Sequence, residues 1–144
     1  MNWRNGSRGR FAVDVTILNN EDVILSKRGT LEPEKVRQVQ SKGIVDTGAA
    51  RLVLPEAVVT QLGLPFAGVV AVKYADGRKA KRKRAKEALV RLEGREGNFS
   101  AVVEPRRVDA LIGAIVLEEL DLLVDSTNEK LVPRDPKMVI SECE

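Results

Sequence analysis

The chain has 144 residues, a length typical of one domain. Hydrophobic residues make up 43% of it but aromatic residues only 3%, so the core has to be built from aliphatic side chains. The formal net charge is only +3. No apolar run approaches the length of a membrane span and no signal-peptide pattern opens the chain, so we expect a cytoplasmic protein with no membrane segment.

Two residue types limit the chemistry of the chain. Histidine is absent and cysteine occurs once, as Cys143 in a polar tail. These counts exclude an intrachain disulfide, the Ser-His and Cys-His nucleophile arrangements and His-rich zinc sites. We therefore expect no metal and no cofactor, and a hydrolase built from this chain would have to use carboxylates.

The first quarter of the chain is predicted to hold a hairpin and a loop. Residues 1–10 are polar and basic, and we predict a disordered segment there that only Trp3 could anchor. Phe11 to Leu18 alternates apolar with polar or small residues, which indicates a strand, and turn-forming residues 19–22 then lead to a second strand at Val23 to Leu25.

The following segment, residues 26–42, is charged and carries Pro33. We predict a loop there, with a short strand at Val36 to Val39, and its sequence indicates no role.

The most informative stretch follows this loop. Ile44 and Val45 are β-branched and predict the end of a buried strand, while Thr47 and Gly48 break the apolar run. Asp46 therefore lies at a strand end, where hydrogen bonds from the Thr47 hydroxyl and from backbone amides can hold its carboxylate. A carboxylate held in this way suits acid/base chemistry, although Asp-x-Gly is also ordinary turn chemistry.

A helix and a second hairpin are predicted next. Pro55 suits the first position of a helix and Gly63 its end, with Ala57, Val58 and Leu62 on the apolar face. The next segments are a strand at 69–74, a tight turn at Asp76-Gly77 and a long return strand at 78–91.

The last third of the chain predicts short strands around one helix. Gly113 closes a strand that contains Leu111 and Ile112, and it is followed by a helix. The predicted elements are strands at 88–92, 99–103, 109–112, 122–125 and 131–132 and a helix at 114–120.

Two of these motifs together resemble the retropepsin-like aspartic proteases. In that family an apolar strand ends in Asp-Thr-Gly-Ala, as at Asp46 to Ala49, and a later strand ends in two apolar residues and a glycine before a short helix, as at Leu111-Ile112-Gly113. The resemblance covers residues 11–136, followed by a polar tail at 137–144. It implies a mostly β fold: a small closed antiparallel β barrel with one or two short helices.

The resemblance also implies roles for individual residues. Asp46 would be the catalytic acid, supported by Thr47, Gly48 and Ala49. Leu111, Ile112 and Gly113 would pack behind the acid. The hairpin turn would be the flap that closes over a peptide or protein substrate, and it consists of Tyr74, Ala75, Asp76, Gly77 and Arg78.

One credible acid per chain predicts a homodimer. The protease mechanism needs two close carboxylates, so the second Asp46 has to come from another copy of the chain. Two alternatives stay open: a catalytically silent peptide-binding or scaffolding module, and a basic nucleic-acid-associated protein. The second alternative depends on seven cations between Arg78 and Lys86, but no aromatic residue is interleaved with them for base stacking.

Overall fold

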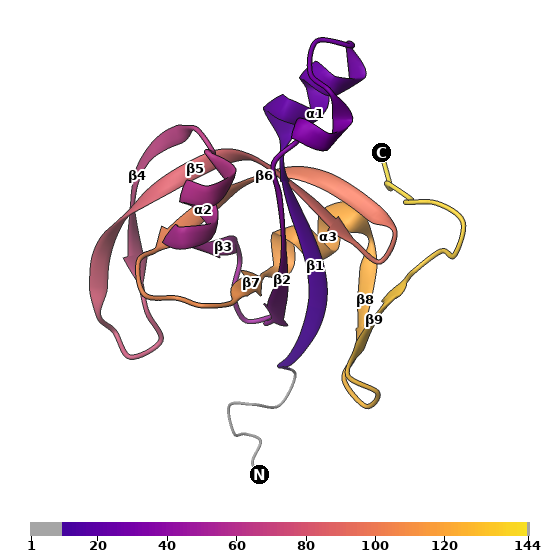
Figure 1. Ribbon diagram of the computed structural model, residues 1–144. Coiled ribbons are helices and arrows are strands. Elements are labelled where there is room, and N and C mark those ends of the chain that lie inside the picture. Colours follow the sequence, from indigo (N-terminus) through magenta and orange to yellow (C-terminus); the bar gives the residue numbers. More distant parts are fainter. Residues whose placement is uncertain (1–9, 144) are drawn as a thin grey trace.

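Six strands form a closed barrel in the computed structural model, which describes residues 10–143 (Figure 1). The strands follow one another around the barrel in the order β1 (Phe11–Asn19), β2 (Gln38–Val45), β7 (Ala110–Ile112), β3 (Leu52–Pro55), β6 (Arg95–Glu104) and β5 (Lys79–Leu92). β5 pairs again with β1, which closes the barrel. The disorder predicted for residues 1–10 concerns positions that, apart from Arg10, lie outside the described residues.

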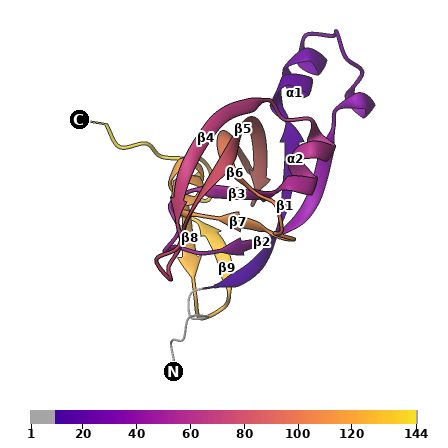
Figure 2. The ribbon, with the colours of Figure 1, turned by 90° about the vertical axis from the view of Figure 1, so that its left-hand side faces the viewer.

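The barrel confirms the predicted fold class. Most ladders are antiparallel, whereas β2 runs parallel to β7 and β3 runs parallel to β6. A seventh strand, β4 (Phe66–Lys73), pairs with the first half of β5 and extends from the barrel as a hairpin (Figures 1 and 2).

Two predicted helices are confirmed. α2 (Glu56–Leu62) follows Pro55 and ends at Gly63, whose φ of 63° is a left-handed conformation that favours glycine. Val58 and Leu62 of α2 are buried, but Ala57 is exposed, so its place on the apolar face was wrong. α3 (Ala114–Leu120) has the predicted bounds.

A helix stands where the sequence predicted the second strand of the first hairpin. α1 (Asn20–Lys27) includes Val23 to Leu25, so the strand predicted there is wrong. The side chain of Asn19 accepts a hydrogen bond from the backbone N–H of Asp22 at 3.0 Å and so caps the helix. Within the apolar triplet Val23 is buried and Ile24 and Leu25 are exposed, which suits one face of a helix.

The segment 26–42 is only partly a loop. It contains a short 3-10 helix, η1 (Pro33–Lys35), and then enters β2 at Gln38. The strand predicted at Val36 to Val39 is therefore the beginning of a longer one. β2 pairs residue by residue with β1, from Leu18 opposite Gln38 to Phe11 opposite Val45, and this pairing explains a strand made largely of polar residues.

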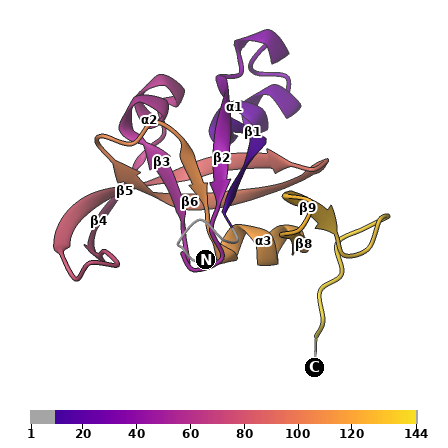
Figure 3. The ribbon, with the colours of Figure 1, turned by 90° about the horizontal axis from the view of Figure 1, so that it is seen from below.

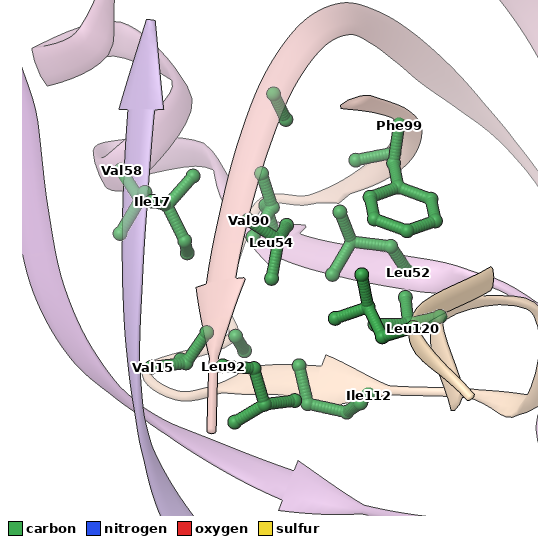
Figure 4. Packing of buried hydrophobic residues seen from close by; sticks show 14 of the residues in the cluster. Val15, Ile17, Leu52, Leu54, Val58, Val90, Leu92, Phe99, Ile112 and Leu120 are labelled. Carbon is green, nitrogen blue, oxygen red and sulfur yellow. The ribbon is translucent and has the colours of Figure 1, made fainter. Parts of the chain in front are cut away.

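Aliphatic side chains fill the barrel, as the composition predicted. Figure 4 shows Ile17 of β1, Leu54 of β3, and Val90 and Leu92 of β5 in one cluster. Leu120 of α3 joins this cluster from the side.

Two further strands lie beside the barrel. β8 (Leu122–Asp125) and β9 (Lys130–Pro133) are the two strands predicted after α3, and they form an antiparallel hairpin that is separate from the barrel sheet. Among the residues that the structure describes, no helix is long and apolar enough to cross a membrane.

Candidate active site

The loop after β2 holds Asp46 by backbone contacts. The amide of Asp46 donates to the carbonyl of Ile112 in β7 at 3.1 Å, which continues the parallel pairing of β2 and β7 by one residue. The amide of Gly48 donates to Oδ1 of Asp46 at 3.0 Å, and the amide of Ala49 donates to the Asp46 carbonyl at 3.1 Å. The carboxylate is thus oriented by its own turn, as the sequence predicted for turn amides.

Gly113 fixes the rest of this loop by lying directly against it. A Cβ at Gly113 would lie 2.4 Å from the carbonyl oxygen of Arg51 and 2.8 Å from that of Ala49. The two amides that follow Gly113 donate to the same loop: Ala114 to the Ala49 carbonyl at 2.8 Å and Ile115 to the Ala50 carbonyl at 3.0 Å. The start of α3 therefore binds the backbone of the acid loop, defined here as residues 46–51.

The environment of the Asp46 side chain is partly open. Its side chain is 14% exposed, and Oδ2 accepts a hydrogen bond from Nη2 of Arg10 at 2.7 Å. Arg10 itself is 54% exposed. Thr47, predicted to support the acid, is exposed, and no hydrogen bond of its hydroxyl is found within the described part of the chain.

The predicted hairpin turn is present, and Gly77 occupies its position of positive φ. The amide of Tyr74 donates to the Arg78 carbonyl at 2.8 Å, and Gly77 has a φ of 89°. Asp76 accepts bonds from the amide and from Nε of Arg78. Ala75 is exposed at the tip. The turn thus spans Tyr74 to Arg78 between β4 and β5, longer than the two-residue turn that the sequence predicted.

An open groove of about 610 Å³ lies between the acid loop and this hairpin. Figure 3 shows that the β4–β5 hairpin and the loop joining β2 to β3 flank one end of the barrel. The groove brings together three predicted regions: Gly48 and Ala49 of the acid loop, Leu111 of β7, and Tyr74 and Arg78 of the hairpin. Asp46 itself does not line the groove, but its carboxylate accepts a hydrogen bond from the amide of Gly48, which does. Ile112 is buried in the core.

A small polar network forms one wall of the groove. Glu104 at the end of β6 accepts a hydrogen bond from the Tyr74 hydroxyl at 2.6 Å and one from Nε of Arg82 at 2.8 Å. The bond to the Glu104 carboxylate raises the pKa of Tyr74. The guanidinium of Arg78 lies 4.8 Å from the centre of the Tyr74 ring. Both polar and aromatic groups of Tyr74 are thus occupied.

Several groove residues were missed from the sequence, namely Arg51, Lys73, Glu104, Arg106 and Arg107. Arg82 was visible there as a member of the basic strip from Arg78 to Lys86. Arg10, assigned to the N-terminal segment, was also missed as the partner of Asp46. The sequence carried no local signal for these residues because they come from segments that meet only when the barrel closes.

The part of the chain that the structure describes holds no group of three or more His, Cys, Asp or Glu residues able to bind a metal ion.

Comparison with known proteins identifies the family. The profile of a family described as aspartyl protease matches residues 33–116, more than half of the chain. The chain therefore belongs to the aspartyl protease family. The match includes both the acid loop and Gly113.

A solved structure agrees with this assignment and defines the fold. EIAV protease complexed with the inhibitor HBY-793 superimposes with a TM-score of 0.55 at 16% sequence identity, covering 92% of this chain and 99% of the other. The fold is thus that of the retropepsin-like proteases. A search of curated protein sequences found no match.

Proposed function

We propose that this protein is an aspartic endopeptidase that acts as a homodimer, with Asp46 of each subunit forming the catalytic pair. The observation that carries the proposal is the position of Asp46: its backbone is bound to β7, its carboxylate is oriented by Gly48, and an open groove begins beside it. The one carboxylate among the groove-lining residues, Glu104, is already bound to Tyr74 and Arg82. A second catalytic acid therefore has to come from another copy of the chain.

The proposed mechanism is the one general to aspartic proteases. Two carboxylates about 3 Å apart share one proton and hold a water molecule between them. The ionised carboxylate takes a proton from the water as it attacks the peptide carbonyl carbon, and the protonated carboxylic acid donates its proton to the carbonyl oxygen. Thr47 would brace the pair across the interface, and the turn from Tyr74 to Arg78 would cover the substrate and exclude water.

Mixing wild-type and Asp46→Asn chains tests the shared site. At equal amounts and with free exchange, random pairing leaves about one dimer in four with two native acids, so activity per wild-type chain should fall to about half. Excess Asp46→Asn chain should reduce it further. Constant activity per wild-type chain, with exchange shown independently by subunit labelling, would mean that each subunit works alone.

The pH profile gives a second readout. Two close carboxylates resist double ionisation, so peptide cleavage should peak on the acid side of neutrality, where the pair holds one proton. Activity should fall above this range as the second proton leaves and below it as both acids become protonated. The measurement is kcat/KM across pH on one peptide, and a profile that rises steadily into alkaline pH would contradict the carboxylate pair.

One contact favours a catalytically silent peptide-binding module as the second candidate. Arg10 occupies Oδ2 of Asp46, on the carboxylate that the mechanism needs to be accessible. Replacement of Arg10 by Gln separates the two candidates: a protease freed of this contact keeps or gains cleavage, whereas a silent module binds peptides and cleaves none with either residue.

Location in the cytoplasm stays a prediction, and fractionation of the cells that make the protein would check it.

A further inference from the structure

The groove beside the acid loop is far more basic than the rest of the molecule. Five arginines and Lys73 line it, against one acid, Glu104. This local excess of five positive charges is larger than the formal net charge of +3 for the whole chain. The five arginines are Arg51, Arg78, Arg82, Arg106 and Arg107.

The arginines differ in how far they are neutralised by the protein. Arg78 pairs with Asp76 and Arg82 pairs with Glu104, both at 2.8 Å. Within residues 10–143, the other three take part in no ion pair. Arg107 donates from Nε to the carbonyl of Asp109 at 2.6 Å, which orients its guanidinium while leaving the charge uncompensated. The groove therefore presents positive charge that a ligand can pair with.

The base of the groove is apolar. Val102 and Leu111 are buried and Val53 and Val72 are half-buried, whereas Arg51 and Arg106 are exposed. An aliphatic side chain suits the apolar base, and carboxylates on either side of it suit the arginines.

The basic strand β5 divides its cations between two faces. Side chains alternate along a strand, and Arg82, on the face toward the groove, is half-buried. Lys79 and Lys81 lie on the opposite face and are exposed. The positive charge of the groove is thus distinct from the solvated charge on the outside of the hairpin, and the outer lysines provide a matched control.

The occupied state of Tyr74 argues against nucleic acid as the ligand. Tyr74 is the one aromatic residue among those lining the groove; its hydroxyl binds Glu104, and the guanidinium groups of Arg78 and Arg82 lie 4.8 and 6.0 Å from the centre of its ring. Single-stranded nucleic acid is bound by stacking successive bases on several aromatic side chains. A peptide needs none.

We infer that the groove selects peptide substrates that carry acidic side chains next to an aliphatic residue. As a statement about substrates this inference depends on the proposed protease function, although the binding preference itself can be measured without turnover. Electrostatic attraction of this kind is strongest at low ionic strength and weakens as salt screens the exposed arginines.

Matched peptides test the inference. Two fluorescent peptides are identical except that Glu residues flank the central aliphatic residue in one and Gln residues flank it in the other. Their binding is measured by anisotropy on the full-length Asp46→Asn chain, and their cleavage is measured on the wild-type chain. At low salt the Glu peptide should bind about tenfold more tightly than the Gln peptide, and the preference should decline in high salt.

Two double variants in the Asp46→Asn chain localise the preference. Arg106→Gln with Arg107→Gln should reduce it to less than about threefold, whereas Lys79→Gln with Lys81→Gln removes the same charge outside the groove and should leave it unchanged. Thermal unfolding of each variant checks that the fold is intact.

The outcomes separate this inference from the proposed function. Three binding results would overturn the acidic-peptide inference: equal affinity for the two peptides, no binding of either peptide, or the same loss of preference in the Lys79→Gln, Lys81→Gln control. It would also be overturned if a single-stranded oligonucleotide displaced the bound Glu peptide at a lower concentration than unlabelled Glu peptide does. A preference for the Glu peptide in binding, without cleavage by the wild-type chain, would support the inference and reject the protease proposal.

Discussion

The two ends of the barrel each hold an aspartate beside an arginine, and the two pairs differ in kind. Asp22 of α1 is 9% exposed and accepts three hydrogen bonds from Arg37: from the amide, from Nε and from Nη2. Asp46 accepts one hydrogen bond from Arg10 and one from the Gly48 amide and lies at the open end of the barrel. α1 and the acid loop lie at opposite ends in Figure 1.

The difference shows what a carboxylate is available to do. All the partners of Asp22 belong to the fold and hold α1 against the start of β2, so its charge serves stability. Asp46 is positioned by the backbone of its own loop, and Arg10 reaches it through one hydrogen bond, whereas Arg37 reaches Asp22 through three. A carboxylate with a single bond to an arginine is more easily freed for a substrate, so the two acids should respond in opposite ways to substitution.

The largest expected effect is on activity, at Asp46. Asp46→Asn keeps the shape and the bond from Gly48 but removes the acid, so peptide cleavage should fall about a thousandfold or more. The free energy of unfolding should change little, because the ion pair with Arg10 is exposed. Steady-state cleavage and urea unfolding measure the two quantities, and wild-type rates in the folded variant would remove the assignment of Asp46.

The acid loop depends equally on the small size of Gly113. Gly113→Ala places a Cβ against backbone atoms of Arg51 and Ala49, which cannot rotate away. We therefore expect the free energy of unfolding to fall by about 3 kcal/mol and peptide cleavage to fall with it. Gly77→Ala at the hairpin tip is the contrast: it meets no atom within 4 Å and should cost only about 1 kcal/mol through its positive φ. Equal melting temperatures for the Gly113→Ala and wild-type proteins would show that the loop can move.

The contrast between the two ends also explains what the sequence could predict. The acid loop was predicted from two short motifs, Asp46-Thr47-Gly48 after a strand and Gly113 before a helix, and from the resemblance of the pair to one family. The helix α1 was not predicted, because Val23 to Leu25 has the composition of a strand. Its cap, Asn19, is stabilised by distant backbone, donating from its side chain to the Leu62 carbonyl at 2.8 Å.

The groove was predictable only in part for a similar reason. Arg82 stood in a visible basic strip, but alternation along β5 decides which cations face the groove. Arg106 and Arg107 come from the segment before β7, and Glu104 from the end of β6, so their approach to Tyr74 depends on closure of the barrel. Spacing along a chain carries no information on such contacts.

At the opposite end of the barrel, Asp22→Ala should reduce stability and spare catalysis. It removes the hydrogen bonds to Arg37 and leaves the Arg37 amide without its partner, which should cost about 2 kcal/mol. Cleavage per folded molecule should stay at the wild-type level, because the acid loop and groove are unchanged. Urea unfolding and active-site titration measure these two results, and a parallel loss of specific activity would mean that α1 and the acid loop are coupled.

The smallest effect is the pH dependence of the Asp22 contribution, and its sign follows from the ion pair. The hydrogen bond from the Arg37 side chain lowers the pKa of Asp22 below its ordinary value of 3.8, so the folded state holds this proton less tightly than the unfolded state does. The stabilisation by the charged form is present above pH 3.8 and is lost as the pH falls through the folded-state pKa. The Asp22→Asn protein lacks this charge at every pH, because the amide does not titrate, so its stability has no such pH-dependent contribution. The difference in unfolding free energy between wild type and Asp22→Asn should therefore be constant near neutrality and shrink below about pH 4.

Carboxylates elsewhere whose pKa is also lowered, such as Asp121 and Asp125, are common to both proteins and cancel in the difference. Urea unfolding from pH 7 to pH 2 measures it, and a difference that stays constant over this range would show that the charge of Asp22 contributes nothing to the fold.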